Sequence, residues 1–141
     1  MLDFYNIPTY ARPKLREGED YVTPDGEIIP NERLTTPPTR SRSYAYCSDT
    51  APCPGIIEKI KGIDLLYHEA TFADKEKGRA KETFHSTARQ AATTAREAEV
   101  KKLIIGHFSS RYDDETQLLA EACEIFPHTY LAKENKTFKI E

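Results

Sequence analysis

The sequence predicts an α/β fold in which helices cover a single sheet. The 141-residue chain is 38% hydrophobic and 30% charged, which is typical of a globular domain. From residue 43 onward, short apolar segments alternate with helical patterns, as in layered α/β proteins. Residues 1–42 differ, because they hold six of the nine prolines and a turn signal at Pro24-Asp25-Gly26. We therefore expect residues 1–42 to form a proline-rich extended segment with a small hairpin and no core of its own, and residues 43–141 to form the α/β unit.

Several segments of the α/β unit have the composition of strands. Residues 43–50 (SYAYCSDT) and 64–69 (DLLYHE) are aromatic or apolar and short, which favours strands over helices. Residues 102–108 (KLIIGHF) contain a continuous apolar run, as strands buried on both faces do. Residues 128–132 and 137–141 are expected to form a terminal strand pair, which would make the sheet mixed.

Helices are expected between and after these strands. Residues 52–61 (PCPGIIEKIK) open with two prolines and read as a short helix that begins after them. A longer helix begins after Thr87, since Thr87 and Gln90 have the spacing of a capping box and alanines recur at 88, 91, 92 and 95. The last helix begins among the acidic residues 113–115 and ends before Pro127.

Charge and cysteine content narrow the possible functions. The 20 basic and 23 acidic residues give a net charge of -3, so the chain as a whole lacks the basic surface of a general nucleic-acid binder. The three cysteines have no Cys-x-x-Cys spacing, which indicates a reducing compartment. No apolar run reaches the roughly 18 residues of a membrane span. We expect a cytoplasmic protein with no membrane partner.

Four polar residues occupy positions suited to chemistry. Asp49, Glu69 and His107 each follow or end a predicted strand, and ligand-binding groups gather at the carboxyl ends of strands in α/β sheets. His85 precedes the capping box, where an imidazole can act as a general acid beside a bound anion. Taken singly, each has a structural alternative: a turn residue, a solvated carboxylate, a hydrogen-bonded core histidine or a neighbour of a cap. The pair His68-Glu69 does not begin a helical zinc-protease motif, because Phe72 stands where the second histidine belongs.

The order of four motifs resembles one enzyme family. The segments YCSDT, DLLYHEATF, FHSTARQAATTAREAEVKKLIIGHFSSRY and TYLAKENKTFKI are similar to the C-terminal half of ribonuclease Z, the tRNA 3′-processing endonuclease of the metallo-β-lactamase superfamily. The resemblance implies a four-layer αββα fold, of which this chain would supply one mixed sheet with helices on one face. It also implies a zinc-dependent endoribonuclease that removes 3′ trailers from precursor tRNA by phosphodiester hydrolysis.

The resemblance assigns a role to each of the four residues. Asp49 matches an aspartate that bridges two zinc ions, and His107 matches a histidine ligand of one ion. Glu69 and His85 match a carboxylate and histidine that act beside the scissile phosphate, the histidine protonating the leaving 3′-oxygen. Arg111 is a candidate phosphate contact, whereas Glu134 stands where the family has aspartate, so no role is assigned to it.

The chain also departs from the family. The main metal motif, His-x-His-x-Asp-His, belongs to the N-terminal half of the family and is absent here, so the zinc site is incomplete and the chain alone is expected to be inactive. We expect its partners to be the N-terminal half of the same protein and precursor tRNA, and an uncovered sheet face to drive dimers or other homo-oligomers. The alternatives are another metallo-β-lactamase-type phosphodiesterase or hydrolase, and a non-catalytic partner-binding fragment.

Overall fold

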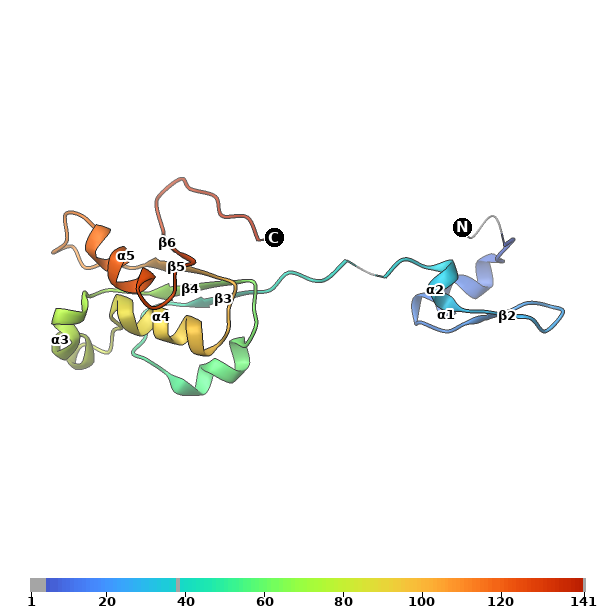
Figure 1. Ribbon diagram of the computed structural model, residues 1–141, viewed down its shortest axis with the longest axis horizontal. Coiled ribbons are helices and arrows are strands. Elements are labelled where there is room, and N and C mark those ends of the chain that lie inside the picture. Colours follow the sequence, from blue (N-terminus) through green and yellow to red (C-terminus); the bar gives the residue numbers. More distant parts are fainter. Residues whose placement is uncertain (1–4, 38, 141) are drawn as a thin grey trace. The chain divides into compact units, whose positions relative to one another are not determined.

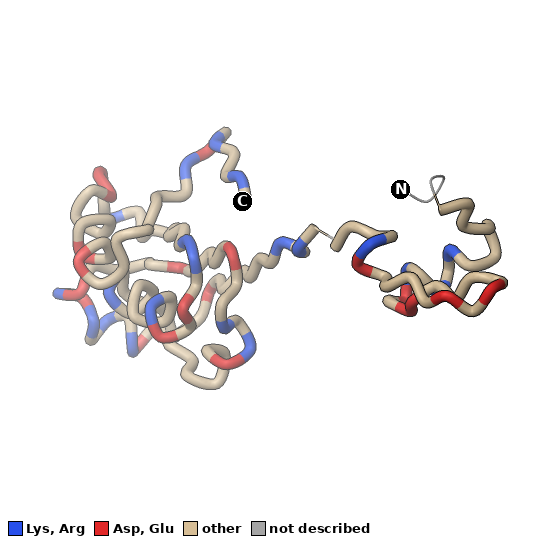
Figure 2. The backbone as a smooth tube through the Cα atoms, turned by 45° about the vertical axis from the view of Figure 1, so that its right-hand side comes forward, with Lys and Arg blue, Asp and Glu red and all other residues tan. Residues whose placement is uncertain are grey.

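The computed structural model describes residues 5–37 and 39–140, which belong to two compact units (Figure 1). The division falls between Ser41 and Arg42. Basic and acidic residues are interspersed along the C-terminal unit, in keeping with the near-neutral composition (Figure 2).

The N-terminal unit contains the expected hairpin. Strand β1 (Tyr21–Val22) pairs in antiparallel fashion with β2 (Ile28–Ile29). Three short helices were not expected: η1 (Thr9–Ala11), α1 (Arg12–Arg16) and α2 (Asn31–Leu34). They contribute to a small core, so the expectation that this segment has none is wrong; its buried members are Ile7, Ala11, Leu15, Tyr21, Ile29 and Leu34. Helices of four or five residues are too short for a periodicity that sequence analysis can detect.

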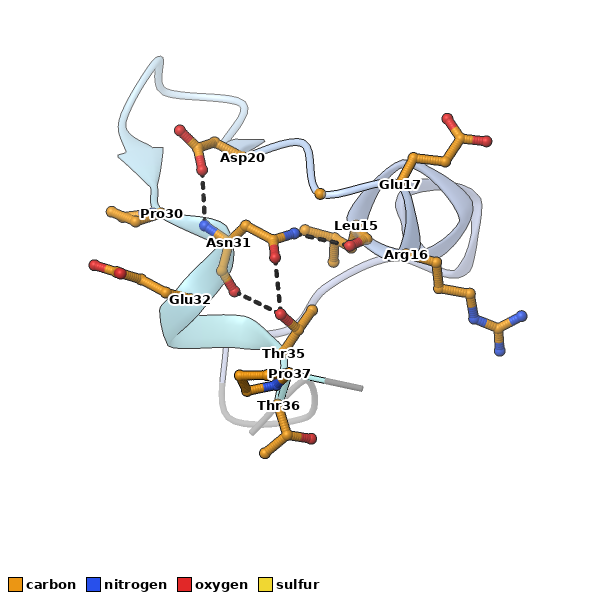
Figure 3. A pocket seen from close by; sticks show the side chains of 11 residues that line it. Leu15, Arg16, Glu17, Asp20, Pro30, Asn31, Glu32, Thr35, Thr36 and Pro37 are labelled. Carbon is orange, nitrogen blue, oxygen red and sulfur yellow. Dashed lines mark hydrogen bonds between the residues drawn. The ribbon is translucent and has the colours of Figure 1, made fainter. Parts of the chain in front are cut away.

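A cavity of about 760 Å³ lies in this unit, and Asn31 is hydrogen-bonded to several of the residues that line it (Figure 3). The Asn31 amide donates to the carbonyl oxygens of Leu15 and Glu19 at 2.8 Å, and the Thr35 hydroxyl donates to its oxygen at 2.8 Å. The backbone N–H of Asn31 donates to Asp20 at 2.7 Å. None of the four candidate site residues lines this cavity, so its size does not indicate where the chemistry occurs.

The C-terminal unit is built on a four-stranded sheet in the order β3-β4-β5-β6 (Figure 1). The strands are β3 (Tyr44–Cys47), β4 (Leu65–Glu69), β5 (Lys102–Gly106) and β6 (Thr129–Leu131). The predicted α/β class is confirmed. Every pairing in this sheet is parallel, whereas a mixed sheet was expected. The difference arises because residues 137–140 form no strand, and residue 141 lies outside the described residues. Phe138 and Ile140 line a groove of about 390 Å³ with Leu65, Tyr67 and Ile104.

Helices cover one face of this sheet. They are η2 (Pro54–Ile60), α4 (Ala88–Glu97) and α5 (Thr116–Cys123), whose buried residues share one core with the sheet. Two short helices, η3 (Asp74–Glu76) and α3 (Lys77–Glu82), lie between β4 and α4 in the chain. The capping box at Thr87 and Gln90 is present, and the predicted alanine stripe of α4 is fully buried against the sheet. Helix α5 ends four residues before Pro127, and α3 was not expected. None of the helices within residues 5–37 and 39–140 combines the length and the apolar character that crossing a membrane requires.

The strand register separates the sheet into a covered and an open face. Leu66, Leu103 and Ile105 point to the helices and are fully buried. The opposite face presents a row in which Tyr46, Tyr67, Ile104 and Tyr130 lie side by side, with Tyr44 in the next row. Tyr44, Tyr46 and Tyr130 are exposed, so this face carries aromatic surface that helices do not cover.

Candidate active site

The four residues singled out from the sequence meet at the carboxyl ends of the strands. One ligand atom from each of Asp49, Glu69, His85 and His107 lies within 4.8 Å of the others. Glu69 is the last residue of β4, His107 directly follows β5, and Asp49 lies two residues beyond β3. His85 reaches the same point from the loop between α3 and α4. Parallel strands end at one edge of the sheet, which explains why residues far apart in sequence converge there.

Glu69 is the structural centre of this group. Its side chain is fully buried and accepts five hydrogen bonds. One oxygen, Oε1, accepts from the backbone N–H of Thr50 at 2.9 Å and from His85 Nδ1 at 2.9 Å. The other, Oε2, accepts from the N–H groups of Thr71 and Ser86, each at 3.1 Å, and from the Thr71 hydroxyl at 2.7 Å. The carboxylate therefore joins the loops that follow β3 and β4 to the loop that precedes α4.

The hydrogen bonds determine the charge of Glu69. Burial raises its pKa, because a carboxylate is less stable away from water. The bonds from the Thr71 hydroxyl, His85 and the amides of Ser86 and Thr71 outweigh burial, so the pKa of Glu69 lies below its ordinary value. Glu69 is thus ionised at neutral pH in spite of being buried.

His85 is oriented by Glu69. When its Nδ1 carries the hydrogen that Glu69 accepts, the second ring nitrogen, Nε2, is left to bind or release a proton. The side chain is 20% exposed, and the Phe72 ring packs edge-on against it with centroids 6.0 Å apart. A buried carboxylate that holds one imidazole nitrogen fixes the tautomer and the direction of the ring. This arrangement suits a proton donor.

Thr71 connects this pair to His107, and sequence reasoning missed it. Its hydroxyl oxygen lies 2.9 Å from His107 Nδ1 and 3.3 Å from His85 Nδ1, while it donates to Glu69. The backbone continues the link, because the N–H of Ser109 donates to the Thr71 carbonyl at 3.1 Å. Its place two residues beyond a strand-end glutamate was the one signal in the sequence that could have found it.

Asp49 and His107 differ from Glu69 in being open to solvent. Both have left-handed backbone conformations, with φ of 54° and 60°, which aspartate and histidine adopt more readily than most residues. The Asp49 side chain is 75% exposed and accepts no hydrogen bond from a described residue; its Oδ1 lies 3.6 Å from His85 Nδ1. His107 uses Nδ1 toward Thr71, which leaves Nε2 open. These two side chains have free atoms to offer to a ligand.

The donor atoms fit part of a metal site. Imidazole nitrogen and carboxylate oxygen are the ligands that zinc takes from histidine and aspartate. Glu69 is not available as a ligand, because its two oxygens already accept five hydrogen bonds. Asp49 and His107 are available, and two ligands are fewer than a zinc ion requires. A metal at this position needs further ligands from outside the described residues.

Other residues that the sequence singled out lie in structural settings. His68 is buried, and its Nδ1 lies 2.8 Å from the Glu69 carbonyl oxygen; burial lowers its pKa, so the ring is neutral. The Arg111 guanidinium pairs with Glu76 at 3.2 Å and lies 5.0 Å from the centroid of the Phe72 ring. Glu134 is exposed, and nothing in the structure assigns it a role.

Comparison with known proteins identifies the fold family. The sequence model of the beta-lactamase superfamily domain matches residues 33–108, more than half of the chain. The chain belongs to the beta-lactamase superfamily. A metallo-beta-lactamase fold protein of Bacillus subtilis, YhfI, shares the fold at 22% identity with a TM-score of 0.65, over 70% of this chain and 40% of that one.

The relatives with higher identity carry one name. The chain is 60% identical over 140 residues to the protein named ribonuclease Z of Bacteroides thetaiotaomicron, and 58% identical to that of Phocaeicola vulgatus. These matches cover 99% and 100% of this chain but 44% and 46% of the relatives, so the chain spans less than half of their length. Human tRNase Z, short form, has a TM-score of 0.58 at 27% identity, over 81% of this chain and 37% of that one. The resemblance to ribonuclease Z that the motifs indicated is confirmed.

Proposed function

We propose that this chain is part of a zinc-dependent endoribonuclease that removes 3′ trailers from precursor tRNA. The observation that carries the proposal is the convergence of Asp49, Glu69, His85 and His107 at one sheet edge, in a chain 60% identical to a ribonuclease Z. The relatives are more than twice as long as this chain, and in this proposal a half that corresponds to their remaining part supplies the rest of the site. The chain alone is therefore inactive. The cysteine spacing supports a reducing compartment, and we propose the cytoplasm.

In this proposal the residues divide the work. Asp49 and His107 hold metal together with ligands from outside the chain, and a bound zinc ion would supply Lewis-acid charge at the cleaved phosphate. His85, protonated on both nitrogens, delivers the Nε2 proton to the 3′-oxygen as the bond from phosphorus to that oxygen breaks. The oxygen of a water molecule forms the new bond to phosphorus, and that water releases one proton to solvent. Glu69 balances the imidazolium charge through the 2.9 Å hydrogen bond to Nδ1. The Thr71 hydroxyl, which lies between the two rings, holds His85 and His107 in their relative positions.

The open face of the sheet supports the proposed partner. Tyr44, Tyr46 and Tyr130 expose apolar area that a second polypeptide can cover, and we propose that the missing half of the protein does so. Without that half, we expect the chain to associate with itself through the same face. Light scattering of the isolated chain that shows a stable monomer would contradict this expectation.

The experiment is to replace the matching 140 residues of the Bacteroides thetaiotaomicron protein with this chain and to measure cleavage of precursor tRNA. We expect the chimera to remove the 3′ trailer of the precursor tRNA. Its zinc content is measured by elemental analysis. His85→Ala should lower cleavage by about 100-fold or more with metal retained, and Asp49→Ala should lose metal. His128→Ala is the matched control, because His128 is exposed and lies outside the group. A folded, zinc-loaded chimera that does not cleave would refute the proposal and favour another hydrolase or a binding fragment.

A further inference from the structure

Phe84 occupies a backbone position that is unsuited to a bulky side chain. It follows helix α3, where the N–H of His85 donates to the Ala80 carbonyl at 2.8 Å and the N–H of Phe84 to that of Lys81 at 3.4 Å. These two bonds form the helix-ending motif in which glycine is the usual residue at the left-handed position. Phe84 has that conformation, with φ of 59°, which is strained for an aromatic residue.

The Phe84 ring is largely open to solvent. The Phe84 side chain is 76% exposed, and it makes no ring contact with another aromatic residue of the described chain. Phe72, by contrast, is buried and packs against both His85 and Arg111. An exposed aromatic ring on a strained backbone points to contact with another molecule, since strain of this kind collects at binding sites.

The position of Phe84 indicates which molecule. It directly precedes His85, whose ring nitrogen faces the group of Asp49, Glu69 and His107, so the two side chains leave the same short loop. The preceding segment, residues 74–82, has four basic and three acidic residues. Its three lysines, Lys75, Lys77 and Lys81, are exposed and form no ion pair with described residues. An exposed ring beside free lysines is the pattern by which proteins hold single-stranded nucleic acid, because bases stack on the ring and phosphates meet the cations.

We infer that Phe84 is a stacking platform for an unpaired RNA base next to the phosphate that His85 serves. The lysines of residues 74–82 attract the backbone of the same strand. The inference rests on the proposed function for its choice of RNA, and it adds a substrate-binding residue directly before His85 in the same loop. Stacking tolerates any base, so Phe84 contributes affinity without selecting a sequence.

The chain offers a direct test, because it contains no tryptophan. Phe84→Trp places a single fluorophore at the site, to be titrated with a single-stranded RNA of about six nucleotides, a length that one stacking site and its flanking lysines can span. We expect saturable quenching that weakens as salt is raised. Tyr10→Trp is the matched control, since Tyr10 is 79% exposed but lies in the N-terminal unit. Quenching by an abasic oligonucleotide of equal length, or equal quenching in Tyr10→Trp, would overturn the inference.

Stability and substrate binding should respond to Phe84 in opposite directions. Phe84→Gly should raise the midpoint of thermal unfolding of the chain by about 4 °C, because glycine removes the left-handed strain. In the cleavage-competent chimera, Phe84→Ala should weaken binding of precursor tRNA by about 5- to 100-fold, the loss expected for one stacked base, and Phe84→Tyr should restore it. A lower midpoint in Phe84→Gly would show that the ring supports the fold and would overturn the inference.

The design separates this inference from the proposed function. The fluorescence titration needs no catalysis, so quenching in a chain whose chimera fails to cleave supports RNA stacking and refutes only the endonuclease. A chimera that cleaves, with Phe84→Ala binding precursor tRNA as tightly as the parent, refutes only the stacking. If the remaining part of the ribonuclease Z relative quenches Phe84→Trp and RNA does not, the ring packs against protein and the inference is wrong.

Discussion

Replacing Glu69 with glutamine should destabilise the C-terminal unit more than any exposed carboxylate does. Glu69 accepts five hydrogen bonds while fully buried, three of them from backbone N–H groups. Glutamine keeps the shape but replaces one acceptor oxygen with an NH₂ group that can only donate. Whichever way the amide is turned, its nitrogen faces at least one backbone N–H that cannot change partner. Placed at Oε1, it opposes the N–H of Thr50; placed at Oε2, it opposes those of Thr71 and Ser86.

The size of the stability loss is set by whichever orientation of the glutamine amide costs less free energy. With the NH₂ group opposite Thr50, His85 can adapt by exchanging its tautomer, and one buried N–H is left unpaired at about 1–3 kcal/mol. The bonds that persist lose their charge assistance, which weakens each of them. Together these losses lower the free energy of unfolding by about 2–4 kcal/mol. Glu82→Gln is the control, because Glu82 is 71% exposed and its ion pair with Arg79 is worth about 0.5 kcal/mol or less.

The assay is urea unfolding at pH 7, followed by far-ultraviolet circular dichroism, which reports mainly on the helices of the C-terminal unit. Measurement at two protein concentrations separates association through the open sheet face from folding. If Glu69→Gln unfolds within 0.5 kcal/mol of the parent, the hydrogen bonds do not hold the loops, and the account of Glu69 as the structural centre is wrong.

Three further predictions concern the same unit. Burial lowers the pKa of His68 below 6.5, so on acidification the unfolded chain binds a proton that the folded chain does not. The free energy of unfolding should therefore fall as pH drops below about 6.5. His68→Gln should reduce the slope of that fall by up to about 1.4 kcal/mol per pH unit. Gly106→Ala should cost about 1–3 kcal/mol in urea unfolding, because the new Cβ would lie 2.5 Å from the Tyr67 hydroxyl, and Tyr67→Leu in the same chain should reduce the cost. Thr71→Val should shift His107 toward the tautomer with hydrogen on Nε2, as seen by ¹⁵N NMR of the imidazole, since Nδ1 loses its partner.

Each of these predictions has its control. His128→Gln should leave the pH slope unchanged, because His128 is exposed. Thr94→Val, on the buried side of α4, should leave the His107 tautomer unchanged. If the stability losses of Gly106→Ala and Tyr67→Leu simply add in the double variant, the proposed clash is contradicted. An unaltered His107 spectrum in Thr71→Val would show that the Thr71 hydroxyl does not set the tautomer.

The sequence predicted the position of the site better than its interior. Asp49, Glu69 and His107 were recognisable because each ends or follows an apolar segment, and parallel strands bring such ends together. Thr71 was missed, because apart from its place two residues beyond Glu69 its role depends on three loops that meet around one hydroxyl. Nothing in the residue itself distinguishes it from the other threonines.

The helices and the last segment show where periodicity fails. Helix α4 was predicted from its alanine stripe and its cap, whereas α3 has one buried residue, Ala80, and therefore no stripe to detect. Residues 137–141 alternate polar and apolar side chains as an edge strand does, yet residues 137–140 pair with no strand. Their apolar members, Phe138 and Ile140, line a groove with residues of the open sheet face, and burial there satisfies the same pattern without pairing.

In the proposed enzyme, the arrangement of hydrogen bonds explains how this chain can hold its share of the site in advance. All five donors to Glu69 lie between Thr50 and Ser86, so the orientation of His85 is set within the C-terminal unit and needs nothing from elsewhere. Asp49 accepts no hydrogen bond from a described residue, and His107 is held only through Nδ1 by the Thr71 hydroxyl, so both keep free ligand atoms. In the proposed enzyme, the proton donor is thus complete before assembly, while metal binding waits for ligands from the other half of the protein. Cleavage would then require assembly because assembly completes the metal site, and not because assembly positions His85.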